Sequence, residues 1–296
     1  MGINCKAKVK GAHAEGYNTE ASGQYSHTEG TDTLATMNNG HAEGNRAKAL
    51  HYNAHAEGQD TIANANSAHA EGEKTQAHTR GSHSEGIRTS AGTLSETNED
   101  GTYKVDNRNL YEGAHAEGYE TKSQGVGAHA EGRFTVAEED ASHAGGFSRP
   151  EEKGFDEWGN EKTWPAGEIR ASGEGSFAHG YIYPGWAGGG TYHNPGHIIA
   201  SGKGAFALGC AGNYWGTGIT EASGDGSFAM GNNTKAQGNY SVALGEESRA
   251  WETGAFAAGI MSDAVTEGSV AMGYFAEAEG EGSIALGTMV TATAPY

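Results

Sequence analysis

The chain is poor in the residues that build a conventional hydrophobic core. Leu, Ile, Val and Phe together make up only 33 of its 296 residues, whereas Gly alone accounts for 49. With a formal net charge of −19, such a composition is typical of disordered chains, because too little apolar surface can be buried to offset chain entropy. A folded state therefore requires a regular repeat.

Other features that the sequence lacks exclude several classes of protein. Cys5 and Cys210 are the only cysteines, which excludes a disulfide scaffold. The chain has no run of about 18 apolar residues that could form a transmembrane helix, and its first residues lack the apolar stretch of a signal peptide. The 38 acidic residues outnumber the 19 basic ones, so we expect no nucleic-acid partner and no membrane partner.

Glycine recurs at intervals of 14 residues along most of the chain. It closes a five-residue block such as AHAEG (12–16) or SVALG (241–245) in 16 repeats. These closing glycines are Gly16, Gly30, Gly44, Gly58, Gly72, Gly86, Gly118, Gly132, Gly146, Gly180, Gly209, Gly231, Gly245, Gly259, Gly273 and Gly287. A fixed period of this kind is the signature of a solenoid.

Small and large residues alternate within each repeat. In a strand, Ser241 and Ala243 would face one way, while Val242 and Leu244 face the other. After the next turn, small residues again occupy every second position of the strand. We therefore predict an all-β fold, a β-solenoid of the parallel β-roll type. Each 14-residue coil should contain two short strands and two turns, with the small residues filling a thin interior.

The larger residues of the later repeats would then form a continuous apolar stripe on the outside. A stripe of this length has to be covered, and identical chains that meet around an axis parallel to the solenoid cover it most economically. We therefore expect identical chains to associate into a rod. The predicted interface consists of Phe177, Phe206, Phe228, Val242, Leu244, Phe256, Val270, Ile284 and Leu286.

Two blocks in this part, GNYSVALGEESRA (238–250) and GSVAMGYFAEAEGEGSIALG (268–287), resemble the head repeat of YadA-type trimeric autotransporter adhesins. The resemblance is specific over residues 171–292. It implies a left-handed parallel β-roll that trimerises through its apolar stripe, and hence a homotrimeric rod in which the interface residues named above form the trimer interface. Over residues 2–146, His and Glu replace the apolar pair. This HAEG variant resembles repeats in tail fibres and other structural proteins of phages and prophages. The stalk and anchor of an autotransporter are not found, which favours the phage interpretation.

Nine repeats place His at the stripe position, and Glu follows two residues later in eight of them. The nine are His13, His27, His41, His55, His69, His83, His115, His129 and His143. The pattern favours a polar trimer interface, in which imidazole N–H groups donate to carboxylates of a neighbouring chain. Such pairing would raise the pKa of the histidines and lower that of the glutamates.

Two other interpretations of this pattern remain open. Three imidazoles around an axis could bind zinc, nickel or iron, or the face could hold anions or water. We nevertheless expect no resident metal and no other cofactor.

Four intervals exceed 14 residues and mark insertions. One, at residues 92–113, falls in the second turn of its coil. The others, around 147–168, 181–197 and 210–219, enter at the first turn of successive coils and should lie side by side. They contain the candidate ligand-binding residues Trp158, Trp164, Tyr181, Tyr183, Trp186, Tyr192, Tyr214 and Trp215. These aromatics suit a shallow platform for sugar rings. The alternative is that they only pack the loops against the solenoid.

The repeat classes divide the chain into three parts. Residues 1–146 hold His/Glu-type coils, 147–219 hold the coils with aromatic-rich insertions, and 220–296 hold regular coils with the apolar stripe. No nucleophile elbow, phosphate loop or HExxH motif occurs, so we do not expect an enzyme.

Together these patterns predict a structural fibre or spike protein of a phage or phage-like particle, which attaches to glycans of the host surface. Its location would be the virion, as a tail or surface fibre. A first alternative is the head domain of a trimeric adhesin on a bacterial cell surface, and a second is an autoprocessed or hydrolytic tail spike. Since both ends have the sequence of open coils, other particle proteins or a larger chain should cap them.

Overall fold

The computed structural model describes residues 2–92, 113–148, 152–155, 161–164, 166–182, 196–212 and 218–295, with only the backbone described at 152–155 and 161–164. All regular elements in these segments are β-strands. Accordingly, the described residues contain no helix that could cross a membrane. The chain forms two compact units, residues 1–132 and 133–296, which we call unit 1 and unit 2.

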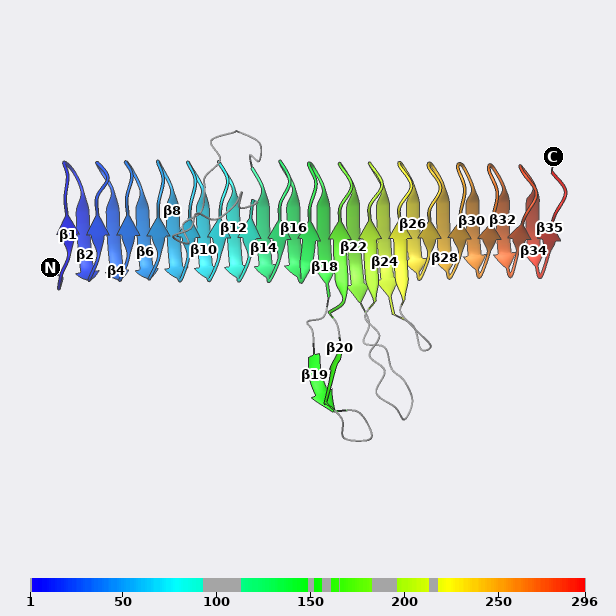
Figure 1. Ribbon diagram of the computed structural model, residues 1–296, viewed down its shortest axis with the longest axis horizontal. Helices are drawn as coiled ribbons and strands as arrows, with labels where there is room; N and C mark the ends of the chain where they lie inside the picture. The colour runs from blue at the N-terminus through cyan, green and yellow to red at the C-terminus, as the bar shows by residue number, and fades with distance from the viewer. Residues whose placement is uncertain are drawn as a thin grey trace. The chain divides into compact units, whose positions relative to one another are not determined.

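Unit 1 is a series of coils that each contain one longer and one shorter strand (Figure 1). The longer strands are β2 (His13–Tyr17), β4 (His27–Thr31), β6 (His41–Asn45), β8 (His55–Gln59), β10 (His69–Glu73), β12 (His83–Ile87), β14 (His115–Tyr119) and β16 (His129–Arg133). The shorter strands are β1 (Lys6–Ala7), β3 (Glu20–Ala21), β5 (Leu34–Ala35), β7 (Lys48–Ala49), β9 (Ile62–Ala63), β11 (Gln76–Ala77), β13 (Ser90–Ala91) and β15 (Lys122–Ser123).

Unit 2 repeats the same plan. Its longer strands are β18 (His143–Phe147), β22 (Phe177–Ile182), β24 (Phe206–Ala211), β26 (Phe228–Asn232), β28 (Val242–Glu246), β30 (Phe256–Ile260), β32 (Val270–Tyr274) and β34 (Ile284–Thr288). Its shorter strands are β17 (Thr135–Ala137), β21 (Glu168–Ala171), β23 (His197–Ala200), β25 (Ile219–Ala222), β27 (Lys235–Ala236), β29 (Arg249–Ala250), β31 (Asp263–Ala264), β33 (Glu277–Ala278) and β35 (Thr291–Ala292). The strands β19 (Glu152–Phe155) and β20 (Glu161–Trp164) form an antiparallel pair of their own.

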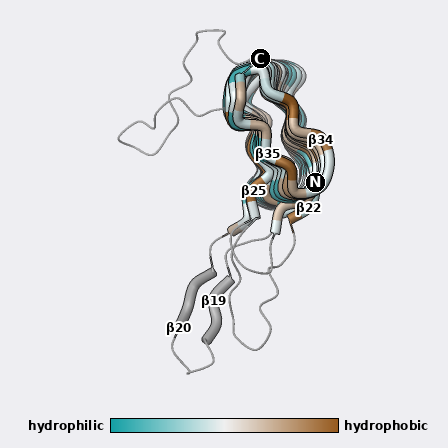
Figure 2. Tube along the Cα trace, turned by 90° about the vertical axis from the view of Figure 1, so that its right-hand side faces the viewer, coloured by the Kyte–Doolittle hydropathy of each residue, from teal (hydrophilic) through white to brown (hydrophobic). Residues whose placement is uncertain are grey.

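Strands pair in parallel with the same strand of the next coil. In the sheet of longer strands, His69 lies opposite His83, and Glu71 lies opposite Glu85. In the sheet of shorter strands, Gln76 lies opposite Ser90. Equivalent residues of successive coils therefore form straight rows. Viewed along the stack, β34 and β35 occupy the two sides of a flattened coil (Figure 2).

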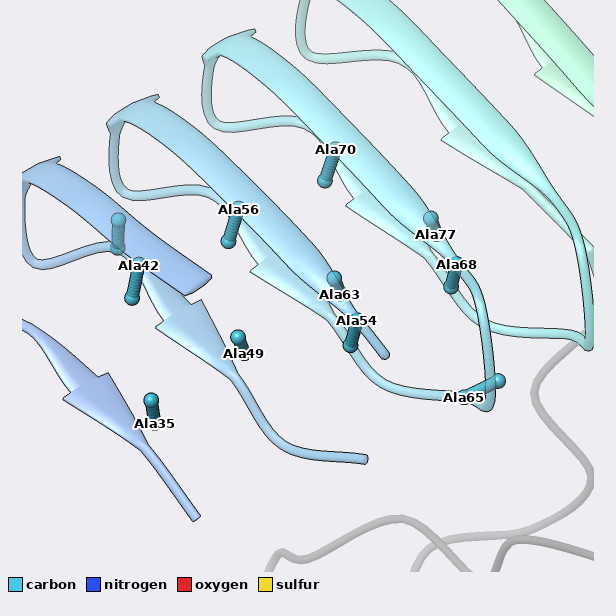
Figure 3. Close-up of a cluster of buried hydrophobic side chains, with 11 residues drawn as sticks. Ala35, Ala42, Ala49, Ala54, Ala56, Ala63, Ala65, Ala68, Ala70 and Ala77 are labelled. Carbon is cyan, nitrogen blue, oxygen red and sulfur yellow. The ribbon is translucent and has the colours of Figure 1, made fainter. Parts of the chain in front are cut away.

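The interior between the two sheets is built mainly from alanine, serine and threonine, and its largest buried side chains are Ile169, Ile182 and Ile198 in unit 2. Ala42 and Ala56 on the longer strands and Ala49 and Ala63 on the shorter strands have no accessible surface, and Figure 3 shows them in successive coils. Thr19 and the threonines at the same place in other coils, directly before the shorter strand, are buried as well. The predicted all-β solenoid with a thin interior of small residues is confirmed.

The insertions also leave the coils at the predicted turns. Residues 92–113 fall between β13 and β14, in the second turn of the coil. The other three insertions follow β18, β22 and β24, each at the first turn. The predicted division of the chain at residues 146 and 219 rests on repeat class and stays a prediction.

The closing glycines are required by the distance between coils. Gly58 has a φ of 111°, and a Cβ atom there would lie 2.1 Å from the carbonyl oxygen of Gly72 in the next coil. A side chain at this position would force the coils apart. Gly81 offers a contrast, because its φ is +66° but no atom of another described residue lies within 4 Å of the place its Cβ would take.

Gly58→Ala should therefore destabilise unit 1 much more than Gly81→Ala. Gly81→Ala introduces backbone strain alone and should lower the free energy of unfolding by about 1 kcal/mol. Gly58→Ala adds the collision with Gly72 and should cost at least about 3 kcal/mol. Chemical denaturation of both variants measures the difference, and equal losses would contradict this account of the closing glycine.

Candidate functional site

The outward face of the longer strands in unit 2 carries the predicted apolar stripe. Phe177 lies opposite Phe206, and Phe206 lies opposite Phe228, with ring centroids 6.0 and 6.1 Å apart. The row continues in register through Val242, Phe256, Val270 and Ile284. The alternation predicted from the sequence thus places these side chains in one row, opposite the small interior residues.

A second apolar row runs beside the first, two residues further along each strand. It contains Leu208, Met230, Leu244, Ala258, Met272 and Leu286. Phe206, Met230 and Met272 are 41%, 44% and 42% exposed, and Leu286 is 61% exposed. A two-residue-wide apolar surface of this length is more than an isolated chain normally shows to water. The stripe has the geometry that the predicted interface needs, although its occupant stays a prediction.

In unit 1 the same face is a ladder of histidine and glutamate side chains. Successive imidazole rings stack along it at centroid distances of 4.6–4.9 Å. Most neighbouring rings are close to parallel, as for His55 and His69 with 3° between their planes. We call this row, from His13 to His129 with the glutamates two residues after each histidine, the His/Glu ladder.

Within one strand the imidazole and carboxylate face each other without touching. The Nε2 atom of His69 is 3.8 Å from the nearer carboxylate oxygen of Glu71, which is too far for a hydrogen bond. The corresponding distances in the strands that begin at His13, His27, His41, His55 and His115 are 3.7–3.9 Å. The Nε2 atoms of His27, His55, His69, His83 and His115 are covered and have no hydrogen-bond partner among the residues that the structure describes.

The expected rise in histidine pKa is wrong. Burial lowers the pKa of His27, His69 and His115, and charge repulsion from the histidines above and below lowers it further. The glutamates act in the raising direction but do not outweigh these effects. The reason is that the parallel register places imidazoles directly on top of one another, and the sequence pairing of His with Glu does not reveal this.

The last histidine of the predicted series, His143, lies in unit 2. Its ring stacks on Phe177 at a centroid distance of 4.6 Å, and Gly145 takes the place that glutamate holds in other coils. Imidazole and phenyl rings therefore occupy the same position of the coil, and either can continue the stack.

The structure describes few of the aromatic residues that are predicted to form the sugar-binding platform. Tyr181 at the end of β22 is 43% exposed, and its ring stacks on Phe147 at 5.3 Å. Trp164 lies in β20, where only the backbone is described. The remaining candidates, Trp158, Tyr183, Trp186, Tyr192, Tyr214 and Trp215, lie outside the described residues.

The described ends of the insertions do lie next to one another. Phe147 is opposite Tyr181, and Ile182 is opposite Ala211, so the chain departs for each insertion from adjacent strands. The ligand-binding role of the aromatics stays a prediction.

We expect acidic pH to lower the free energy of unfolding of unit 1. His27, His69 and His115 have folded-state pKa values below the unfolded value, so their effect on stability is constant above about pH 6.5 and becomes unfavourable as pH falls. The clearest case is the buried His78, whose pKa is lowered to about 4 by burial. Between pH 7 and pH 4 this residue alone should reduce the free energy of unfolding by about 3 kcal/mol.

Hydrogen exchange at pH 7 and pH 4, converted to opening free energies, measures this loss in residues 11–132. His78→Gln, which removes the titrating group, should retain more of its neutral-pH stability in acid than the unaltered chain. The same acid loss in both proteins would show that His78 is not the responsible group.

Comparison with known proteins gives one family match. The model of the YadA head domain repeat matches in two copies, at residues 222–259 and 267–288, both within unit 2. A search of curated proteins finds no match for the chain. The longer strands β26, β28 and β32 lie entirely in the matched stretches. The resemblance inferred from the repeat blocks is confirmed here, because these two stretches of the chain are similar to YadA head domain repeats.

Proposed function

We propose that this chain forms part of a homotrimeric surface fibre of a phage or phage-like particle, and that the fibre attaches the particle to its host. The observation that supports this most directly is the apolar stripe of unit 2, which a single chain leaves open to water. Coverage by two further copies of the same stripe removes this surface from solvent.

The direction of the stripe favours a rotation axis parallel to the stack. Around such an axis each coil meets the equivalent coil of its partners, so Phe206 faces Phe206 and Val270 faces Val270. The trimer in particular is what the resemblance to YadA-type heads implies.

The YadA head match also supports a second candidate, the head of an adhesin on a bacterial surface. Both candidates are extracellular fibres built from the same repeats. The HAEG coils of unit 1 favour the particle, because they resemble the repeats of phage and prophage structural proteins.

Attachment is assigned to the three insertions that follow β18, β22 and β24. Their adjacent departure points would gather them at one edge of the coils, and a trimer would repeat the group three times. Three weak glycan sites on one rigid support bind a surface by avidity. Aromatic rings in the insertions would stack on sugars.

The trimer is tested by placing charge in the stripe. Val242→Asp together with Leu244→Asp should dissociate or unfold the protein, because unpaired carboxylates in an apolar interface cost several kcal/mol. Analytical ultracentrifugation should give three times the chain mass for the unaltered protein and a loss of that species for the double variant. Asn239→Asp with Thr253→Asp adds the same charge at exposed turn positions and should leave the trimer intact. A folded monomer of the unaltered chain would contradict the proposal.

The glycan assignment is tested at the tryptophans of the insertions. Trp186→Ala with Trp215→Ala should weaken binding to host cells or to a glycan array at least about tenfold, since stacked rings anchor sugars at little entropic cost. Trp251 is 40% exposed in a regular coil, so Trp251→Ala serves as the matched control. Unchanged binding of the double variant in an intact trimer would assign these loops to packing alone.

A further inference from the structure

We propose that the His/Glu ladder of unit 1 binds divalent transition-metal ions such as Zn²⁺, with two histidines and one glutamate as the ligands of each ion. The ligand sets lie within a single chain. The inference therefore goes beyond the fibre function and does not depend on it.

Three groups on the ladder have one ligand atom from each residue, all within 4.8 Å of one another. They are His69, Glu71 and His83; His83, Glu85 and His115; and His115, Glu117 and His129. Within the described residues, the first glutamates of the ladder belong to no such group. The candidate sites are thus confined to the coils from β10 to β16.

The group around Glu117 shows the geometry in detail. One carboxylate oxygen of Glu117 is 3.9 Å from Nε2 of His115, and the other is 3.7 Å from Nε2 of His129. These gaps are too wide for hydrogen bonds. They are close to the spacing that an ion requires, because zinc binds nitrogen and carboxylate oxygen at about 2.0–2.2 Å in tetrahedral geometry, which places two ligands of one ion about 3.3–3.6 Å apart. A shift of a few tenths of an ångström would bring each imidazole and the carboxylate to this spacing.

The donor atoms are also available. The Nε2 atoms of His69, His83 and His115 are covered and lack a hydrogen-bond partner in the described part of the chain, although a buried polar atom normally has one. An ion between imidazole and carboxylate would satisfy both. Two nitrogens and one carboxylate suit zinc or nickel, whereas magnesium and calcium prefer sets of oxygen atoms alone.

Small ring movements would complete the sites. The imidazoles of His115 and His129 are parallel within 3°, with centroids 4.8 Å apart, so an ion would have to tilt them toward each other. Their side chains are 35% and 33% exposed, which leaves room for this tilt. The fourth position stays open for water or for a neighbouring chain.

Shared ligands set the stoichiometry. The middle group (His83, Glu85 and His115) shares His83 with one outer group and His115 with the other. Each imidazole offers one Nε2 atom, so each histidine can bind only one ion. When the two outer groups are filled, the middle group has no histidine left. The expected content is therefore two ions per chain.

Calorimetric titration of the untagged full chain with ZnCl₂, after removal of metal by a chelator, tests the inference. We expect two zinc ions per chain and no binding of Mg²⁺. Glu71→Gln with Glu117→Gln removes the anionic ligand of both outer groups while preserving side-chain size, and should lower the zinc content from two ions per chain to at most one, bound by the middle group that keeps Glu85. Glu29→Gln with Glu43→Gln makes the same change at ladder positions outside the groups and should bind zinc as the unaltered chain does.

Fewer than one zinc ion per chain, or equal binding by the unaltered chain and the Glu71/Glu117 variant, would overturn the inference. Equal weakening in both double variants would also overturn it, because it would assign the effect to overall charge. Ultracentrifugation of the same samples separates this result from the fibre proposal. A trimer that binds no zinc contradicts only the metal sites, and a monomer that binds two ions contradicts only the trimer.

Discussion

The close parallel stacking of one coil on the next is the constraint on which the rest of the structure depends. Backbone N–H groups donate to carbonyls of the following coil, as from His27 to Gly40 at 2.9 Å and from Lys48 to Thr61 at 2.9 Å. The interior alanines are fully buried but small, so each coil gains little from apolar burial alone. Stability therefore comes from the sum of many equivalent contacts between neighbours, and closing glycines such as Gly58 keep those contacts short.

Because the fold depends on the stacked backbone and on the interior residues, the side chains on the outer face can differ between coils. Most inward positions hold Ala, Ser or Thr in both units, with the buried Ile169, Ile182 and Ile198 as larger exceptions in unit 2. The outward positions hold His and Glu in unit 1 and mainly apolar side chains in unit 2. One backbone thus presents two chemically different surfaces at the same position of the coil. The stacking of His143 on Phe177 shows that a coil accepts either ring without a change in backbone pairing.

The sequence predicted the features that follow from period and alternation. The spacing of Gly58 and Gly72 implied the coil, and the alternation around Ala243 separated interior from stripe, because both are properties of strand geometry. The protonation behaviour of the ladder could not be predicted in this way. The sequence shows His69 beside Glu71, but only the register shows that His69 also stacks between His55 and His83 at 4.6 and 4.7 Å. The inserted aromatics follow no period, so the turns at which the insertions leave the coils could be predicted but the arrangement of the aromatic side chains could not.

The same register has an electrostatic consequence for the ladder. Glu57, Glu71 and Glu85 lie directly opposite one another in successive strands, and like charges in this position repel. The histidines beside them do not supply the missing positive charge at neutral pH, because burial and mutual repulsion lower the pKa of His69 and His115. A chain with a formal charge of −19 offers few cations of its own to this face. Positive charge from outside the chain is therefore the economical way to stabilise the ladder, and a divalent ion bound by imidazole and carboxylate provides it where those groups converge.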